Sequence, residues 1–295
     1  MSAAFFVLAH PFLESAFAAG TAIALAAGLM GSVVVLRGQV FAGDALSHVA
    51  FTGALAALAL GVDLRLGLYG GCVAFGLLLA LLGRRSAADD TVIGSAFAWV
   101  LGLGALFLSL FTTSSSGTGG DGTAGVSVLF GSILGLTGGQ ALADTVVALA
   151  VASAVVALGR PLLFASLDPA VAASRGVPVR ALSYGFYVLL GVTAGVATQA
   201  VGALLLLGLL AAPAGAAQRL CARPVAALWL SAAIAVGAMW AGLSIAYVVP
   251  VVPPSFGILA VATAVYLATF ARAAVTRRLD GTDTTADARD LVVAP

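Results

Sequence analysis

One aspartate and one histidine stand four residues apart in an otherwise apolar part of the chain, within Gly43-Asp44-Ala45-Leu46-Ser47-His48. On a helix, residues i and i+4 lie on the same face, so one divalent cation can contact both side chains. Carboxylate oxygen and imidazole nitrogen together suit Zn(II), Mn(II) or Fe(II). Because ionisable residues inside a membrane segment usually mark ion or proton paths, we predict that Asp44 and His48 lie on the path of a transition-metal ion.

Two ligands alone bind a metal ion weakly. A two-fold dimer with these helices at its axis would bring together two copies of Asp44 and two of His48, which makes a four-ligand site. The alternative interpretation is structural: Gly43 interrupts the chain just before Asp44, so that Asp44 can cap the following helix while His48 bonds to the backbone. The sequence leaves both interpretations open.

The composition predicts a membrane protein. The chain has 295 residues, of which 62% are hydrophobic and 8% charged, and its mean hydropathy is +1.15. Soluble domains carry about 25% charged residues, so a water-soluble fold is excluded. A membrane β-barrel needs segments of alternating polarity, whereas the apolar runs here are continuous and about 17 to 25 residues long, the length of a spanning helix. We therefore expect an all-α, polytopic helical fold.

The basic residues exclude some functions and orient the chain. All 13 are arginine, and without lysine the chain has neither a Walker A loop nor a Schiff-base lysine. We expect a transport subunit rather than an enzyme, with any ATP hydrolysed by a separate chain. If the first apolar run crosses inward, twelve arginines lie inside and only Arg65 outside. This positive-inside bias predicts an external N-terminus and a cytoplasmic C-terminus.

The apolar runs predict about nine spanning helices. They lie at about 13–36, 45–62, 64–83, 92–111, 141–159, 182–200, 201–217, 225–248 and 256–272. A Ser- and Gly-rich loop follows the fourth run. After that loop, residues 126–137 are apolar but about a dozen in number, which is too short to span and indicates a re-entrant or interfacial segment. We expect one transmembrane domain over 1–278 and a disordered cytoplasmic tail over 279–295.

The longest inner loop, 160–181, contains the pattern of a short helix. Leu167-Asp168-Pro169 can open it, since aspartate suits the N-cap and proline the first turn. Gly176 can close it, with Pro178 just beyond. Such a helix on the cytoplasmic face can dock a partner domain, although a tight helical connector is the simpler interpretation.

Four other polar residues fall within or near the apolar runs. Glu14 and Asp144 lie near the outer ends of their runs, where snorkelling or helix capping is the expected role. Gln199 lies in the break between two runs. We take Gln199 and Thr52 as candidate residues lining the transport pathway.

At these residues the chain resembles the ABC-3 family, the zinc and manganese ABC importer permeases. Six motifs in the family's order, spread over nearly the whole chain, carry the resemblance: Val35-Leu36-Arg37 with Gly43 to His48, Asp90-Thr91-Val92-Ile93-Gly94, Leu129 to Gly135, Leu163 to Pro169, Gln199-Ala200-Val201-Gly202, and Ala211-Ala212-Pro213-Ala214. Three departures are Gly38, where the family usually has a second basic residue, Ser255, where it usually has glycine, and the extended Gly- and Ser-rich loop Thr112–Thr123.

The resemblance implies a homodimeric permease in the plasma or inner membrane, similar to the type II ABC importer permeases. It implies two partners besides the lipid bilayer, a cytoplasmic ATP-binding subunit and an extracytoplasmic metal-binding protein, and no nucleic acid. It also implies that Asp44 and His48 coordinate the passing metal, manganese or zinc, with no permanently bound cofactor. The 160–181 loop would couple to the ATPase through Leu167, Asp168, Pro169, Arg175, Gly176, Val177 and Pro178.

The mechanism expected for such a permease is alternating access, in which the metal binds transiently and leaves easily. A secondary transporter driven by protons or sodium is the main alternative. It needs intramembrane carboxylates, for which only Glu14, Asp44 and Asp144 are candidates, and usually an inverted repeat, of which the sequence gives no convincing sign. An intramembrane metallohydrolase would need three convergent ligands and a general base.

Overall fold

The computed structural model is helical throughout the part of the chain that it describes, residues 11–82, 90–114, 129–131, 133–203 and 205–290. Its elements are α2 (Pro11–Leu36), α3 (Val40–Ala59), α4 (Leu64–Leu82), α5 (Asp90–Ser114), the 3₁₀ turn η1 (Ile133–Gly135), α7 (Gly138–Ala157), α8 (Gly159–Leu167), α9 (Pro169–Ser174), α10 (Val179–Val201), α11 (Leu206–Leu220), α12 (Pro224–Val248) and α13 (Pro254–Asp290). These helices confirm the predicted all-α class.

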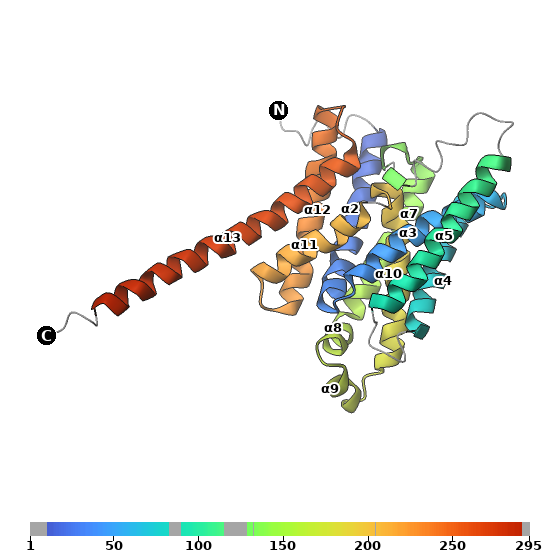
Figure 1. Cartoon of the computed structure of the whole chain (residues 1–295). Coiled ribbons are helices and arrows are strands. Elements are labelled where there is room, and N and C mark those ends of the chain that lie inside the picture. Colours follow the sequence, from blue (N-terminus) through green and yellow to red (C-terminus); the bar gives the residue numbers. More distant parts are fainter. Residues whose placement is uncertain (1–10, 83–89, 115–128, 132, 204, 291–295) are drawn as a thin grey trace.

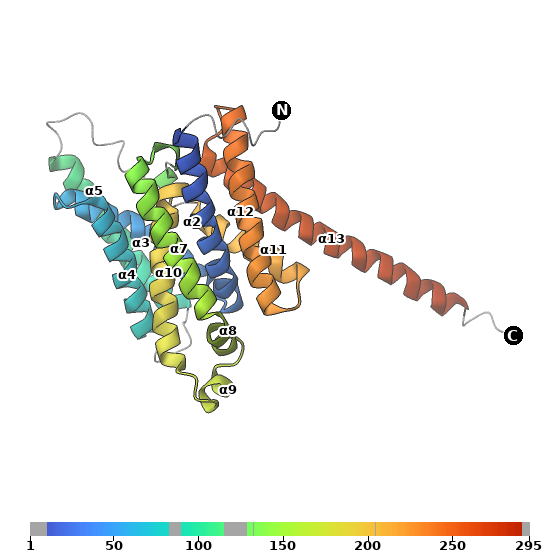
Figure 2. The ribbon, with the colours of Figure 1, turned by 180° about the vertical axis from the view of Figure 1, so that it is seen from behind.

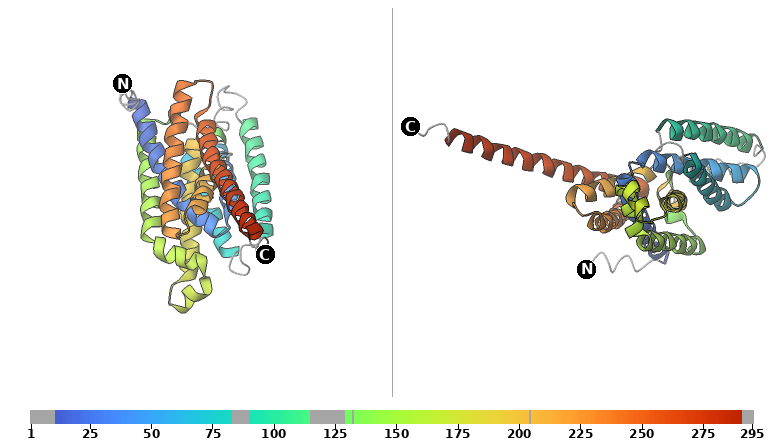
Figure 3. Two further views of the ribbon diagram at one scale, coloured as in Figure 1. Left: turned by 90° about the vertical axis from the view of Figure 1, so that its left-hand side faces the viewer. Right: turned by 90° about the horizontal axis from the view of Figure 1, so that it is seen from below.

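The long helices form three groups (Figure 1). In the middle, α2 packs against α7 and α10; α3, α4 and α5 flank this centre on one side, and α11, α12 and α13 on the other. In the most apolar window of α2, 78% of the residues are buried, against 17% in α5. The core is therefore built around α2, and α5 lies at the edge of the bundle, as the view from below also shows (Figure 3).

In the described part of the chain, eight helices are long and apolar enough to cross a membrane, one fewer than the nine predicted runs. The difference is α11, whose 15 residues extend over roughly 22 Å and do not span a hydrocarbon core of about 30 Å. The first residue of the predicted run 201–217 belongs to α10, which continues to Val201. Gly202, with a φ of +93°, ends α10, so that α11 begins later than the predicted run. Among the described residues, the nine predicted apolar runs thus correspond to eight candidate spans and one shorter helix.

Two glycines from separate motifs meet at this break. Gly131 and Gly202 both have positive φ, +73° and +93°, and a Cβ on Gly131 would lie 2.5 Å from the Gly202 nitrogen. A Cβ on Gly202 would collide with the Leu129 carbonyl oxygen. The short apolar segment predicted over 126–137 falls partly outside the described residues; its described part packs against the end of α10 and contains the η1 turn.

The last helix, α13, continues to Asp290, through the first part of the tail expected over 279–295, and projects away from the bundle (Figure 1). Extending an existing helix costs much less than nucleating one, so the apolar span of α13 can carry a polar helical extension. Residues 291–295 lie outside the described part of the chain.

Close glycine contacts hold α3 against α4, and they give a testable prediction. A Cβ on Gly67 would collide with the Gly53 carbonyl oxygen and lie 2.5 Å from the Ala57 Cβ. At Gly70, one helical turn further along α4, nothing lies within 4 Å of an added Cβ. We expect Gly67→Ala to destabilise the protein by about 1–3 kcal/mol, as overpacking does, and Gly70→Ala to be neutral or stabilising. Thermal unfolding of the two variants in detergent measures this difference, and equal unfolding temperatures would contradict it.

Candidate metal-ligating site

Asp44 and His48 lie on one face of α3, as predicted. The helix begins at Val40, after Gly38 turns the chain with a φ of +66° and Gln39 takes the N-cap position. Asp44 is therefore in the second turn of α3 and does not cap it, so the structural alternative for Asp44 is wrong. Its Oδ1 atom lies 4.0 Å from Nε2 of His48.

The Asp44 and His48 side chains are partly exposed and do not hydrogen-bond to each other. Their exposed fractions are 27% for Asp44 and 21% for His48, while most neighbouring α3 residues are buried. A separation of 4.0 Å is too long for a hydrogen bond, so carboxylate oxygen and imidazole nitrogen both remain available to a ligand. The Phe97 ring of α5 lies beside His48, with 5.3 Å between the ring centroids, and gives the pair an apolar wall.

No group of three or more His, Cys, Asp or Glu side chains that could hold a metal occurs among the described residues. A single copy of the chain therefore offers two donors at this position in the described structure. That number suits a metal passing through better than a closed structural site, which needs four ligands.

Thr52 lies one turn beyond His48, on the same face of α3. Its hydroxyl donates a 3.3 Å hydrogen bond to the Val100 carbonyl oxygen of α5, and Thr52 is only 6% exposed. The face formed by Asp44, His48 and Thr52 is thus directed toward α5, and the exposed fraction of these residues falls from Asp44 to Thr52. That Thr52 lines the transport pathway remains a prediction.

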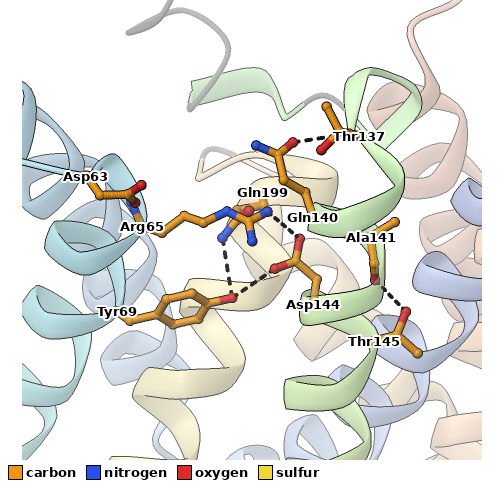
Figure 4. Close-up of polar contacts among 9 residues, drawn as sticks. All are labelled: Asp63, Arg65, Tyr69, Thr137, Gln140, Ala141, Asp144, Thr145 and Gln199. Atoms are coloured by element: carbon orange, nitrogen blue, oxygen red, sulfur yellow. Dashed lines mark hydrogen bonds and ion pairs between the residues drawn. The ribbon is translucent and has the colours of Figure 1, made fainter.

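Gln199 belongs to a separate polar network that joins α4, α7 and α10 (Figure 4). Its side-chain amide donates to the Tyr69 hydroxyl over 3.3 Å, and that hydroxyl donates to Asp144 Oδ1 over 3.2 Å. The other carboxylate oxygen of Asp144 accepts a hydrogen bond from Arg65 over 3.3 Å. No side chain of this network comes from α3, so the structure does not bring Gln199 together with Asp44 and His48.

Asp144 differs from its predicted role. We expected snorkelling or capping, but Asp144 is fully buried and forms an ion pair with Arg65 across two helices. This pairing could have been predicted from the sequence. Asp144 falls within an apolar run and Arg65 is the single outer arginine, and a buried charge needs a partner of opposite charge. Glu14, by contrast, is exposed in the first turn of α2, in keeping with its predicted place near a helix end.

The predicted short helix in the 160–181 loop is confirmed as α9. Asp168 accepts hydrogen bonds from the backbone N–H groups of Ala170 and Val171, at 3.1 and 2.9 Å, and Pro169 takes the first turn. Gly176 ends the element with a φ of +81°. Figure 2 shows α8 and α9 projecting from the end of the bundle opposite the start of α2.

The surface of α8 and α9 combines apolar and basic side chains. Phe164, Leu167 and Val171 are 37%, 59% and 44% exposed, and Arg160 and Arg175 are exposed beside them. Arg175, Gly176 and Pro178 are exposed and Val177 is partly buried. Exposed apolar side chains grouped on one projecting element are typical of a surface that contacts another protein.

Long apolar helices, the Asp44–His48 pair on a partly exposed helix face and the projecting α8 and α9 fit a multi-pass membrane permease. The chain belongs to the ABC 3 transport family, whose model matches residues 9–273. It is thus the permease subunit of an ABC transporter and not itself an enzyme.

The relatives agree with this assignment. The manganese import system permease protein ScaB of Streptococcus parasanguinis is 31% identical over 80% of this chain and 82% of its own length. The manganese transport system membrane protein MntC of Halalkalibacterium halodurans is 28% identical over 90% and 88%. Among solved structures, PsaBC from Streptococcus pneumoniae in complex with Fab matches with a TM-score of 0.74 and 26% identity, over 92% of this chain and 95% of that one.

Proposed function

We propose that this chain is the membrane permease of a manganese importer and that Mn(II) passes between two copies of it, at Asp44 and His48. The observation that carries the proposal is the pair itself, one carboxylate and one imidazole one turn apart on α3, 4.0 Å from each other and partly exposed. Relatives named as manganese importers favour this metal over zinc.

The donor set fits a transit site for a divalent cation. A hydrated Mn(II) ion exchanges water for carboxylate oxygen and imidazole nitrogen, both of which suit borderline-hard first-row metals. With two donors from each copy, a dimer supplies four, and none is a thiolate that would hold the ion tightly. The ion can therefore bind and leave, as transport requires.

The two ends of the bundle suit two different partners. The exposed apolar and basic side chains of α8 and α9 would contact a cytoplasmic ATP-binding subunit, on the side that the arginine distribution assigns to the cytoplasm. An extracytoplasmic metal-binding protein would deliver the ion at the opposite end. Closure of the two ATPase copies would then drive the permease between its outward-open and inward-open states.

A proton- or sodium-driven carrier is less well supported. Such a carrier needs intramembrane carboxylates and usually an inverted repeat. Of the candidate carboxylates, Asp144 is bound to Arg65 and Tyr69 by an ion pair and a hydrogen bond, and Asp44 belongs to the proposed metal path. Uptake that continues without the ATPase and stops when an uncoupler is added would favour this alternative.

The metal content of cells tests the proposed function. Deleting the chain from its host should lower cell-associated manganese, and a plasmid copy should restore it, with zinc unchanged in both strains. Elemental mass spectrometry measures both metals in one sample. A fall in zinc alone would overturn the choice of metal, and no change in any transition metal would overturn the proposed function.

A further inference from the structure

The turn between α2 and α3 leads directly to the metal-ligating residues, and its backbone is well fixed. The Gln39 nitrogen donates to the Val34 carbonyl oxygen over 2.9 Å, and the Gly38 nitrogen donates to Val35 over 3.1 Å. Gly38 supplies the positive φ that this helix end requires. Asp44 follows Gln39 by five residues within a continuous helix. A displacement of this turn therefore moves the start of α3 and Asp44 with it.

Arg37, in this turn, contacts two other helices at once. Its Nε donates a 2.8 Å hydrogen bond to the hydroxyl of Ser166 in α8. The guanidinium carbon, Cζ, lies over the Phe186 ring of α10, 4.4 Å from the ring centroid. A guanidinium can bond through its edge and stack through its face, whereas a lysine ammonium has no such face. Partial burial lowers the pKa of Arg37 from its ordinary value, but a guanidinium stays protonated in proteins.

The two helices that Arg37 contacts flank α9 in the sequence. Ser166 lies two residues before Asp168, which caps α9, and its hydroxyl is itself bonded to the Leu162 carbonyl oxygen within α8. On the other side, α10 begins at Val179, directly after Pro178. Next to Phe186, the Tyr187 hydroxyl donates to the Gln39 side chain over 2.9 Å. Both Arg37 and Gln39 thus connect the α2–α3 turn to the elements around α9.

We propose that Arg37 is a positioning residue that transmits displacements of α8 and α9 to the start of α3, and so to Asp44 and His48. This inference rests on the proposed function, because it supplies the connection between the ATPase-contacting element and the metal path. When a docked ATPase moves α8 and α9, the hydrogen bond and the ring contact make the α2–α3 turn follow. Without Arg37, ATP hydrolysis and metal release should proceed independently.

The test compares transport with hydrolysis in one preparation. The complete transporter, with its ATPase and Mn(II)-loaded binding protein, is reconstituted in lipid vesicles, and Mn(II) uptake and phosphate release are measured together. Arg37→Gln should retain ATP hydrolysis but lower the number of Mn(II) ions transported per ATP by about fivefold or more, the usual size of coupling between two sites. Arg37→Lys should recover part of the ratio, since it keeps the charge and a donor but not the stacking face.

Two further variants complete the design. Arg223, an exposed arginine in the turn between α11 and α12, is the matched control, and Arg223→Gln should keep the wild-type ratio. Ser166→Ala removes the acceptor for Arg37, together with the local bond of that hydroxyl to the Leu162 carbonyl oxygen, and should lower the ratio in the same direction. This variant decides the question if Arg37→Gln does not fold. A merely structural role for Arg37 would reduce uptake and hydrolysis in parallel and leave the ratio unchanged, which would overturn the inference.

The failure of this inference can be told apart from failure of the proposed function. Asp44→Ala, measured in the same vesicles, should stop Mn(II) transport whatever the role of Arg37. Transport that stops in Asp44→Ala, combined with a wild-type ratio in Arg37→Gln, would reject the coupling role alone. Transport that continues in Asp44→Ala would reject the metal path itself.

Discussion

Replacing either Asp44 or His48 with alanine will abolish manganese uptake while leaving the folded dimer intact. In the proposed dimer, each change would remove one of the two donors of each copy, and therefore two of four. Loss of outer-shell groups alone costs about 10- to 100-fold in metal affinity, so direct loss of ligands should reduce uptake by at least about 100-fold. Both side chains are partly exposed, so truncating them leaves no large cavity and should change stability little.

The measurement is uptake of radioactive manganese into cells that express each variant, normalised to the amount of permease in the membrane. His10→Ala is a suitable control because His10 is the only other histidine of the chain, and it should retain uptake. Asp44→Asn keeps the size of the side chain and one oxygen but not the charge, and it should fall between wild type and Asp44→Ala. Wild-type uptake by both alanine variants would refute the site.

The second large effect is on stability. Asp144→Ala leaves Arg65 and Tyr69 without their shared acceptor in the interior of the bundle. Breaking a buried ion pair from one side costs about 3–5 kcal/mol, and because the Arg65 side chain is 24% exposed we expect the lower end of that range. We expect a clear fall in the unfolding temperature in detergent and a lower yield of folded protein, but Mn(II) transport per folded molecule should persist, since this network lies apart from Asp44 and His48.

A double replacement separates lost packing from the unpaired charge. Apolar residues of similar volume often replace a buried ion pair without loss of stability, so Arg65→Met combined with Asp144→Leu should recover most of the unfolding temperature. An unfolding temperature of Asp144→Ala equal to that of the wild type would show that the network does not hold α4, α7 and α10 together.

Local patterns in the sequence predicted much of this structure. Long apolar runs determine helices because the membrane requires every backbone group to be bonded internally, and the eight spans follow from them. The α9 helix was equally predictable: Asp168, Pro169 and Gly176 each act through the backbone of their immediate neighbours. The shared face of Asp44 and His48 follows from helical periodicity alone.

Features that depend on distant contacts were not predictable in the same way. The pairing of Asp144 with Arg65 joins residues 79 positions apart, and the bond between Arg37 and Ser166 joins residues 129 apart. The short α11 results from Gly202, whose backbone packs against Leu129 and Gly131. Asp44 was a plausible cap by sequence, but Gly38 ends α2 early enough for α3 to begin at Val40.

The central claim is that Asp44 and His48 of two copies share one Mn(II) ion, and pulsed electron paramagnetic resonance tests it most directly. The complex is purified with histidine labelled with ¹⁵N, loaded with Mn(II), and examined for nitrogen coupling to the metal. We predict one bound ion for every two copies of the chain, with coupling to the two equivalent His48 nitrogens that disappears in His48→Ala. One ion per copy, or nitrogen coupling that survives in His48→Ala, would contradict the account.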